Sequence, residues 1–486
     1  MTDEMSIPDA IEVCVVGAGS AALCTAIAAK EAGASVLVLE KAPKELVGGD
    51  LRYCGGFRAV NAEYSNEQFY GELMRVTRGF ADPELTRIMV NESSDMVDWL
   101  TNLKVKWRTN SGAGMSHISV GGGYGLLMHL ISVAEDKGII ILYNTKAVDL
   151  QTDEFGSVCG VHVKRVGDRM RMIKCGAVVL ACGGYSASPE MMCKYFDRHA
   201  DTMHVRGSRY NTGDGIIMAE KVGAKLAWMG DFHGIPEHYD SPRVEGGGVH
   251  MMPYRMGLWV NRNGERFVNE GEDTEDKTYV KVGKEIYAQP GNMAFLVFDD
   301  ALKNMTFRSP FDSLGAILRR PPPDMELPAD LQKRHALRTA LADVYYKADT
   351  VEVLAEKLGV PFTTLKQTID DYNEHILETG GVNATPTAPH AYIPKTGWAY
   401  PVASPPYYAY PAKCGITFTF GGCVANASGE VLDKEENVIP GLYAVGALVP
   451  GIFYYNYAAG SAMTRNAVFG RRAGKNAAEY AKQRVS

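Results

Sequence analysis

The sequence lacks several features that would assign it to other classes of protein. None of its nine cysteines is spaced as Cys-x-x-Cys, the pattern typical of iron–sulfur and structural zinc sites. No apolar run approaches the roughly 20 residues that a membrane-spanning helix needs. Basic residues are not in excess, because 50 Lys and Arg face 57 Asp and Glu. We therefore expect no metal site, no membrane span and no nucleic acid as a partner.

The rest of the composition is that of an ordinary globular protein, with 46% apolar and 22% charged residues. A chain of 486 residues is too long for a single hydrophobic core, so two domains are expected. The first residues, MTDEMSIPDA, are polar and acidic, unlike a secretory signal or a basic transit peptide. These features predict a cytoplasmic protein.

The clearest motif lies near the N-terminus, where residues 11–40 have the pattern strand, glycine turn, helix, strand. Gly17 and Gly19 allow the backbone to approach a pyrophosphate at a helix N-terminus, and Ala22 holds the third position of the fingerprint. Glu40 lies where an acidic side chain accepts hydrogen bonds from ribose hydroxyls. This segment predicts a dinucleotide site without deciding between NAD and FAD.

A second segment at the other end of the chain completes the pattern. Residues 439–474 contain a short apolar strand, a glycine-rich crossing and the start of a helix. Residues 41–56 are glycine-rich just past a strand end, where open parallel sheets bind ligands, and residues 176–184 form another buried strand with a glycine-rich turn. Together these segments favour FAD.

Between these parts the character of the sequence changes, with aromatic, proline and charged residues mixed. The predicted fold is α/β, a Rossmann-like FAD-binding domain with an inserted α+β capping domain that holds the substrate. The FAD-binding domain would comprise residues 1–229 and 389–486, and the capping domain residues 230–388. Residues 318–332, LRRPPPDMELPADLQ, are expected to form an exposed connection.

The order of these motifs resembles that of the flavoproteins of the fumarate reductase and succinate dehydrogenase superfamily. The matching blocks include VVGAGSAALCTAIAAKEAGASVLVLEK, VGGDLRYCGG, VVLACGGYSASPEM, VNRNGERFVNE and IPGLYAVGA. The resemblance implies a capping domain that closes over FAD, and hydride exchange between flavin N5 and a carbon next to an activating carbonyl. It also implies non-covalent FAD, because KELVGGDL holds no histidine to link it.

The catalytic positions of that family differ here. Glu275, Phe418 and Tyr457 stand where fumarate reductases have a proton-donating Arg, a substrate-binding His and a carboxylate-clamping Arg. A C4 dicarboxylate requires fixed bidentate donors, so fumarate reduction is not expected. His233 and His238 are expected to be surface or hydrogen-bonded histidines.

The remaining pattern is similar to that of the 3-ketosteroid and cyclohexanone-type dehydrogenases. In these enzymes a tyrosine of the crossing and a nearby backbone N–H hold the substrate carbonyl as an oxyanion hole, which fits Tyr457 with the amides of Gly460 and Ser461. The resemblance implies desaturation of a bond α,β to the carbonyl of a cyclic ketone or ketosteroid-like substrate. A tyrosine would remove the α-proton while the flavin takes the β-hydride.

The site residues follow from these comparisons. The predicted catalytic residues are Tyr457, Tyr124 and Tyr254, with Tyr239 and Tyr279 as further candidates for the base. The predicted substrate-binding residues are Phe418, Phe420, Tyr455, Gly460, Ser461 and Arg255. The predicted FAD-binding residues are Gly17, Gly19, Ser20, Ala21, Glu40, Lys41, Gly48, Gly49, Asp50, Gly55, Gly56, Ala147, Gly183, Gly184, Asp214, Gly446, Ala447, Ser461 and Ala462.

Several alternatives stay open at this point. The crossing is also similar to that of tricarballylate dehydrogenase, and Arg52, Arg58, Arg255 and Arg465 could form a clamp for a polycarboxylate. The same chemistry could run in reverse as enone reduction. A separate electron acceptor is expected, namely a quinone, another flavoprotein or O₂. The other rivals are an NAD-dependent enzyme and a flavin-binding redox sensor or interaction protein without catalytic activity.

Overall fold

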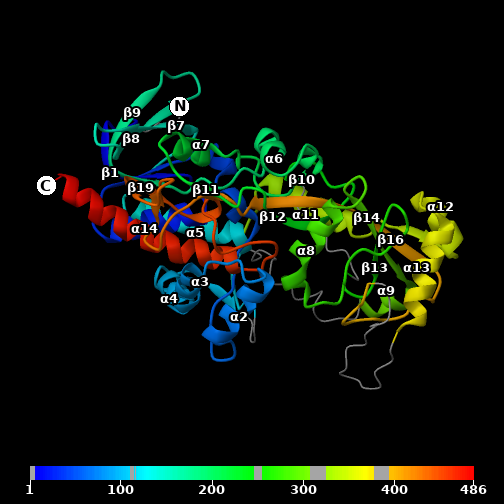
Figure 1. Cartoon of the computed structure of the whole chain (residues 1–486). Coiled ribbons are helices and arrows are strands. Elements are labelled where there is room, and N and C mark those ends of the chain that lie inside the picture. Colours follow the sequence, from blue (N-terminus) through cyan, green and yellow to red (C-terminus); the bar gives the residue numbers. More distant parts are fainter. Residues whose placement is uncertain are drawn as a thin grey trace.

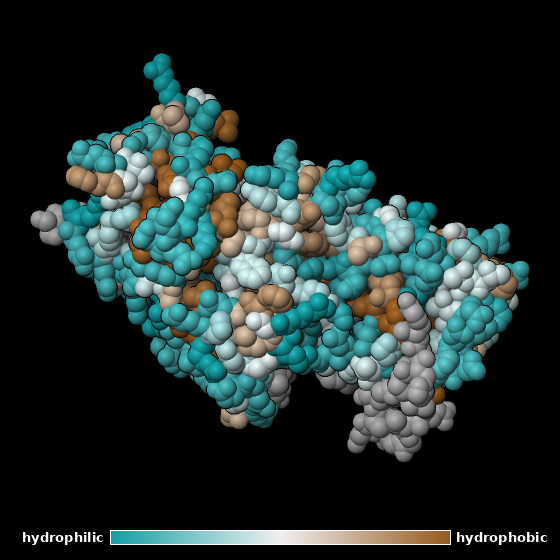
Figure 2. Space-filling model, in the orientation of Figure 1, coloured by the Kyte–Doolittle hydropathy of each residue, from teal (hydrophilic) through white to brown (hydrophobic). Residues whose placement is uncertain are grey.

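The chain forms two lobes that lie side by side, and both termini belong to the same lobe (Figure 1). The structure is a computed structural model, which describes residues 6–109, 114, 116–245, 254–306, 325–376 and 393–485. Each lobe is built around its own sheet. The exposed face in Figure 2 is mostly hydrophilic, and its apolar residues gather in small separate areas.

The sheet of the first lobe is of the dinucleotide-binding type. In the described residues its path is β18–β19–β9–β1–β2–β6, and β7 and β8 extend it beside β9. The pairs β19–β9, β9–β1, β1–β2 and β2–β6 are parallel, and these strands are apolar on both faces because helices cover both sides. The strands are β1 (Ala10–Val16), β2 (Val36–Leu39), β6 (Ile140–Leu142), β7 (Thr145–Thr152), β8 (Val158–Arg165), β9 (Arg171–Leu180), β18 (Glu430–Leu432) and β19 (Val438–Ala444).

The first and last helices of this lobe pack directly against each other, which joins the two ends of the chain (Figure 1). A Cβ atom on Gly474 would lie 2.3 Å from the carbonyl oxygen of Thr25, so glycine permits the close approach of α14 to α1. The helices of this lobe are α1 (Ser20–Glu31), α2 (Asn66–Val76), α3 (Pro83–Asn91), α4 (Ser93–Asn102), α5 (Gly122–Asp136), α6 (Pro189–Tyr195), α7 (Asp214–Lys221) and α14 (Ser461–Val485).

The second lobe is organised by one long strand, β16, which pairs with β10, β12, β14 and β15, while β13 pairs with β14. Its core contains Trp259, Phe298 and Tyr410. The strands are β10 (His204–Val205), β12 (Phe232–His238), β13 (Leu258–Asn261), β14 (Met293–Asp299), β15 (Tyr346–Ala348) and β16 (Tyr407–Thr419). The helices are α8 (Glu275–Tyr287), α9 (Asp300–Thr306), α11 (Ala329–Leu341), α12 (Val351–Leu358) and α13 (Phe362–Glu374).

Two small sheets and short 3₁₀ turns complete the first lobe near the glycine-rich loops. The small sheets consist of β3 (Gly56–Phe57), β4 (Trp107–Thr109) and β5 (His117–Ser119), and of β11 (Leu226–Ala227) and β17 (Gly422–Cys423). The 3₁₀ turns are η1 (Lys44–Leu46), η2 (Gly49–Tyr53), η3 (Ala200–Thr202) and η4 (Gly446–Leu448).

The predicted fold class is confirmed, since β1, α1 and β2 occupy the N-terminal motif and a second sheet is inserted between the two parts of the first. The predicted domain boundaries stay a proposal. We propose that the second boundary lies later than residue 388, because β16 belongs to the second sheet. The predicted connection 318–332 ends inside α11, which begins at Ala329, while residues 318–324 lie outside the described residues. No helix in the described ranges is long and apolar enough to cross a membrane.

Candidate active site

A cavity of about 1020 Å³ opens among the glycine-rich loops of the first sheet and elements of the second lobe. At one end it is lined by the β1–α1 turn and by η4, and at the other by residues of β12, α8 and α11. A cavity of this size, formed between two lobes, is typical of a cofactor and substrate site.

The turn between β1 and α1 is shaped for an anion. Gly17 has a φ of +107°, and a Cβ atom there would lie 2.6 Å from the carbonyl oxygen of Ala181, so no side chain fits. The N-cap residue of α1, Gly19, places no side chain on the first-turn N–H groups. These N–H groups, which include those of Ser20 and Ala21, are therefore available to a pyrophosphate.

Glu40 stands at the end of β2, where its carboxylate is fixed by two backbone groups. One oxygen accepts the N–H of Ala18 at 3.0 Å and the other accepts that of Ala42 at 2.7 Å. Burial raises the pKa of Glu40, and the backbone hydrogen bonds partly offset this rise. Each oxygen keeps a second lone pair, and the residue lines the cavity, as a ribose-binding acid requires.

A cluster of charges closes the other side of the nucleotide end. Lys41 donates to Asp214 at 2.5 Å, and Lys146 pairs with the same carboxylate at 2.8 Å. Asp50 is buried, which raises its pKa to about 6, and it accepts the N–H of Ser208 at 2.7 Å. These contacts hold β2, β7 and α7 in place around the cavity.

Most of the predicted FAD-binding residues line this one cavity. They are Gly17, Gly19, Ser20, Ala21, Glu40, Lys41, Gly48, Gly49, Asp50, Gly55, Gly56, Ala147, Gly183, Asp214, Gly446, Ala447 and Ala462. Gly184 does not, because it packs against Thr419. Ser461 does not either, because its N–H donates to the carbonyl oxygen of Ala458 at 3.1 Å. The uncapped helix and the side-chain-free turn fit FAD.

Tyr457, in the crossing before α14, is positioned by the first turn of that helix. Its hydroxyl oxygen accepts the N–H of Ala462 at 3.0 Å, and the side chain lines the cavity. The residue is 4% exposed, and burial raises the pKa of its hydroxyl. The hydroxyl therefore stays protonated at neutral pH and keeps its own proton to donate.

Three further rings surround Tyr457, and we call the four together the aromatic cluster: His233, Tyr279, Phe418 and Tyr457. The His233 ring stacks on Phe418 with centroids 4.7 Å apart and meets Tyr457 edge-on at 4.9 Å. Its Nε2 atom lies 2.8 Å from the hydroxyl of Tyr279. Burial lowers the pKa of His233 to about 3 and raises that of Tyr279 well above its usual value. The cluster is therefore uncharged at neutral pH.

The other two predicted catalytic tyrosines line the cavity at different places. Tyr124 lies at the start of α5, where its ring faces Arg52 at 5.3 Å. Tyr254 contacts Trp259, with ring centroids 6.0 Å apart. Among the described rings, neither is in contact with Tyr457. Tyr279, one of the alternatives named from the sequence, is the tyrosine that the fold brings to Tyr457, with centroids 6.3 Å apart.

The predicted substrate-binding residues divide in the same way. Phe418, Gly460 and Arg255 line the cavity, and Arg255 lies over the Trp398 ring at 4.2 Å. Phe420 packs behind Phe418 in the core and does not line the cavity. Tyr455 is directed elsewhere, with a φ of +62°, and carries the guanidinium of Arg78 on its ring at 3.3 Å. Both residues support the wall rather than contact the cavity.

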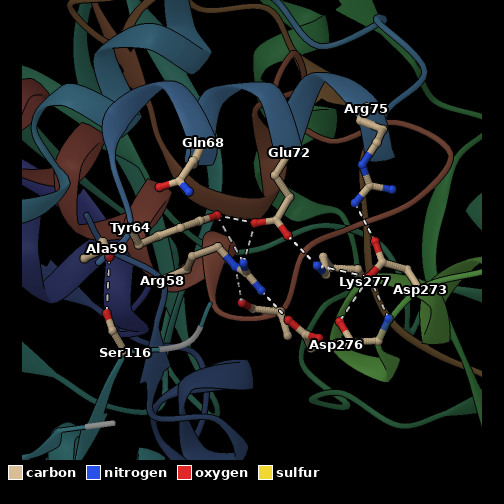
Figure 3. A network of polar contacts seen from close by, with 12 residues as sticks. Arg58, Ala59, Tyr64, Gln68, Glu72, Arg75, Ser116, Asp273, Asp276 and Lys277 are labelled. Carbon is tan, nitrogen blue, oxygen red and sulfur yellow. Dashed lines mark hydrogen bonds and ion pairs between the residues drawn. The ribbon is translucent and has the colours of Figure 1, made fainter. Parts of the chain in front are cut away.

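Arg58 is completely buried at the centre of a polar network (Figure 3). Its guanidinium pairs with Glu72 of α2 at 2.6 Å and with Asp276 of α8 at 2.5 Å, and Nε donates to the carbonyl oxygen of Ala459 at 3.0 Å. Lys277 reaches the same Glu72 at 3.0 Å. Burial alone would lower the pKa of Arg58, but these carboxylates outweigh it and raise the pKa. The network joins the two lobes at the rim of the cavity.

Sequence reasoning left three features of the site without a role. His233 was expected to be merely hydrogen-bonded, and Arg206 and Arg334 carried no pattern of their own although both line the cavity. The block HGIPEH, with His233 on an apolar strand, was the only local signal. The two arginines lie 128 residues apart and meet only in the fold.

Comparison with known proteins identifies the family. The family described as FAD binding domain matches residues 12–463. A probable fumarate reductase, Ifc3, of Shewanella frigidimarina is 31% identical over 97% of this chain and 75% of its own length. The chain belongs to the FAD-binding fumarate reductase family. It is an FAD-dependent oxidoreductase that acts on carbon–carbon double bonds.

Another relative and a solved structure show what else the chain is similar to. The vinyl phenol reductase of Lactiplantibacillus plantarum is 29% identical, over 98% of both chains. The structure of the 3-ketosteroid-Δ4-(5α)-dehydrogenase of Rhodococcus jostii has a TM-score of 0.73 over 98% of both chains, at 24% identity, which establishes a shared fold. The architecture is thus common to reductases and dehydrogenases, and the side chains around the cavity have to distinguish them.

Proposed function

We propose that this protein desaturates a largely apolar, ketone-type substrate. The reaction converts the carbon–carbon single bond α,β to the carbonyl group into a double bond. FAD, when bound, supplies the two-electron exchange at the carbon β to the carbonyl. The observation that carries the proposal is the Tyr457 hydroxyl, held by the Ala462 N–H and lining the cavity beside the uncharged rings of the aromatic cluster.

Tyr457 would hold the carbonyl oxygen. Because the Tyr457 oxygen already accepts the Ala462 N–H, its phenolic proton is directed to another acceptor. The hydrogen bond from the helix amide also makes the Tyr457 hydroxyl a stronger donor. A fixed donor in a buried site stabilises the negative charge that develops on an enolate oxygen. The raised pKa keeps Tyr457 in the protonated form that this role needs.

Tyr279 is our candidate for exchanging the proton at the α-carbon, with His233 as its positioning residue. The 2.8 Å contact with Nε2 gives the Tyr279 hydroxyl a neutral imidazole partner, since the pKa of His233 is lowered to about 3. Tyr124 and Tyr254 remain predictions for the same role. In support of Tyr279, its ring is in contact with that of Tyr457.

The polycarboxylate alternative has weaker support. Of the four arginines considered for a clamp, Arg52 is paired with Asp330 at 2.8 Å and Arg58 with two carboxylates. Arg465 is buried over the Phe453 ring, and burial lowers its pKa to about 10. With two of these cations already neutralised, at most two of the four arginines named from the sequence are left to pair with a substrate bearing three carboxylates.

One observation favours the reverse reaction, enone reduction, as the second candidate. A group that removes a proton must start deprotonated, whereas a group that delivers one must start protonated. Burial raises the pKa of Tyr279 and so favours its protonated form. A protonated Tyr279 is ready to deliver a proton in the reductive direction. One of the relatives, the vinyl phenol reductase, is named for a reaction in that direction.

The partners remain part of the proposal. We propose a small carbonyl substrate and a separate electron partner, namely a quinone, another flavoprotein or O₂. A cytoplasmic location is likewise a prediction from the sequence.

Substitution of Tyr457 by Phe tests the proposal. The variant keeps the ring in the wall of the cavity and removes only the hydroxyl, so FAD should remain bound. Loss of an oxyanion donor lowers the rate of the chemical step by about 100- to 1000-fold. The measurement is stopped-flow anaerobic flavin reduction by a saturated cyclic ketone, and flavin reoxidation by the matching enone.

Tyr455→Phe is the matched control, because this tyrosine lies in the same crossing but does not line the cavity. It should keep the wild-type rate within about threefold. If Tyr457→Phe binds FAD and reacts at the wild-type rate, Tyr457 has no part in the reaction and the proposal fails.

A further inference from the structure

We infer that Arg206 and Arg334 form an anion-binding site for a carboxylate carried by the substrate, beside the aromatic cluster. The inference deepens the proposed function and rests on it for the position of the carbonyl group. The two residues come from different parts of the second lobe. Arg206 follows β10, and Arg334 lies on α11.

The two guanidinium groups are brought together by direct contacts. Arg334 donates from Nη2 to the carbonyl oxygen of Arg206 at 3.3 Å, and its guanidinium lies on the ring of Tyr53 at 3.7 Å. Arg206 donates from Nη1 to the hydroxyl of Thr417 at 3.2 Å. Because Thr417 precedes Phe418 on β16, the pair borders the aromatic cluster.

Neither arginine has a carboxylate partner. Within the described residues, no acidic oxygen lies within 4.0 Å of either side chain. Nε of Arg206 and Nη1 of Arg334 are buried and have no hydrogen-bond partner there. A buried N–H of a cation that is left without a hydrogen-bond partner destabilises the folded protein. Two such atoms at the wall of one cavity indicate that a ligand satisfies them.

Two of the acidic groups near the pair already have other partners. Glu245 pairs with Arg209 at 2.6 Å, and Asp50 accepts hydrogen bonds from the Ser208 N–H and from Asn211. The charge of Glu237, which is buried on β12, acts on Arg334 in the direction that raises its pKa. Burial, together with the charge of Arg206, lowers the pKa of Arg334 to about 10, so Arg334 is still a cation at neutral pH.

The surroundings select the kind of anion. The cavity that these arginines line is also lined by the apolar residues Ile235 and Pro236 of β12 and Leu331 of α11. Planar guanidinium groups match the geometry of a carboxylate. The ligand that fits has a carbonyl at Tyr457, an apolar body, and a carboxylate at Arg206 and Arg334.

Benzoate and benzamide are a suitable pair of probes, because they share shape and differ in charge. Dissociation constants are measured on the FAD-loaded protein from the change in flavin absorbance, at constant ionic strength. We expect benzoate to bind at least about tenfold more tightly than benzamide. Arg206→Gln and Arg334→Gln should each weaken benzoate binding by about 10- to 100-fold and leave benzamide within about threefold.

Arg243→Gln is the matched control. It removes the same charge at an exposed arginine that donates to the carbonyl oxygen of Asp201 and does not line the cavity. Its benzoate affinity should equal that of the wild type. Arg334→Lys keeps a positive charge without the forked donors, so it should recover part of the affinity.

Equal affinity for benzoate and benzamide, or benzoate binding unchanged in both glutamine variants, would overturn the inference. Arg334 lies on a helix at the edge of the cavity, so its variants provide the test if Arg206→Gln does not fold. Failure here would leave the Tyr457→Phe result untouched. Conversely, charge-selective binding together with full activity of Tyr457→Phe would retain this site and remove the proposed function.

Discussion

At the scale of single residues, the site works with neutral groups held in place by burial. Tyr457, Tyr279 and His233 are all shifted toward their uncharged forms because water is excluded from the cluster. Neutral donors and acceptors suit a ketone, whereas the aligned residues of fumarate reductases are charged or imidazole-bearing. The two unpaired arginines then account for a single negative charge on the substrate.

The neutrality of His233 makes the stability of the protein depend on pH. In the unfolded chain this histidine binds a proton near pH 6.5, but in the folded protein only near pH 3. Protonation of this histidine in the unfolded chain therefore lowers the free energy of unfolding as the pH falls from 6.5 toward 3, by up to about 1.4 kcal/mol per pH unit. The free energy of unfolding, measured with urea between pH 7.5 and pH 4.5, should therefore depend less steeply on pH in His233→Gln than in the wild type, by about that amount.

His199→Gln, at an exposed histidine, provides the comparison and should keep the wild-type slope. Identical slopes for wild type and His233→Gln would mean that His233 is protonated in the folded protein. The aromatic cluster would then carry a charge, and the argument for a neutral ketone site would lose its basis.

At the scale of elements, the cofactor half of the site depends on how closely α14 approaches α1. These helices come from opposite ends of the chain, and each supplies an N-terminus to the cavity. Gly470 and Gly474 lie one turn apart on the face of α14 that contacts α1, where a Cβ atom would reach the backbone of Ala21 or Thr25. Small residues at this contact therefore position both helix termini.

Gly474→Ala should destabilise the protein. The new Cβ atom would lie 2.3 Å from the Thr25 carbonyl oxygen, so the helices must move apart, which costs about 1–3 kcal/mol. The free energy of unfolding measured with urea and the affinity for FAD should both decrease. Gly71→Ala on α2, where nothing lies within 4 Å of the added atom, should have no such effect. Equal stability of the two variants would show that α14 and α1 do not need this approach.

The sequence predicted those elements whose signal is local. The glycine turn, the helix and the strands of residues 11–40 form one short motif, so β1, α1 and β2 were expected at the right places. The helix α11 was missed in part, because ADLQKRHALRTAL follows a proline-rich stretch and has few apolar residues to mark a buried face. With α11 missed, Arg334 had no place in the predicted site.

The pairing of side chains could not be predicted in the same way. The contact between His233 and Tyr279 joins β12 to α8, and the two residues are 46 positions apart in the sequence and meet because α8 packs on β12 in the fold. Tyr455 and Tyr457 are two residues apart in one crossing, but a positive φ at Tyr455 turns it away from the cavity. No periodic pattern in the sequence contains that information.

At the scale of the whole molecule, the cavity is bounded by two lobes that Arg58 joins. The guanidinium bridges α2 of the first lobe and α8 of the second, as Figure 3 shows. Because α8 also carries Tyr279, the network fixes the proton-exchanging group relative to the cofactor end.

Arg58→Gln should therefore cost about 3 kcal/mol of unfolding free energy, because it removes a buried cation that pairs with two carboxylates and leaves Glu72 with Lys277 alone as its cationic partner in the described network. Asp276→Asn removes a partner that is 36% exposed, so its effect should be below about 1 kcal/mol. Urea unfolding of the two variants measures the difference. If both lose the same small amount, the network does not hold the lobes together.

The most direct test of the account is the anaerobic absorbance of the flavin band during a challenge with small substrates. Cyclohexanone is added to the oxidised protein and cyclohexenone to the reduced protein, and tricarballylate, succinate and fumarate are tested in parallel. We predict a change with the ketone or the enone that Tyr457→Phe abolishes, and none with the polycarboxylates. A response to the polycarboxylates alone would contradict the account, because it would require a cationic clamp in place of the neutral tyrosine.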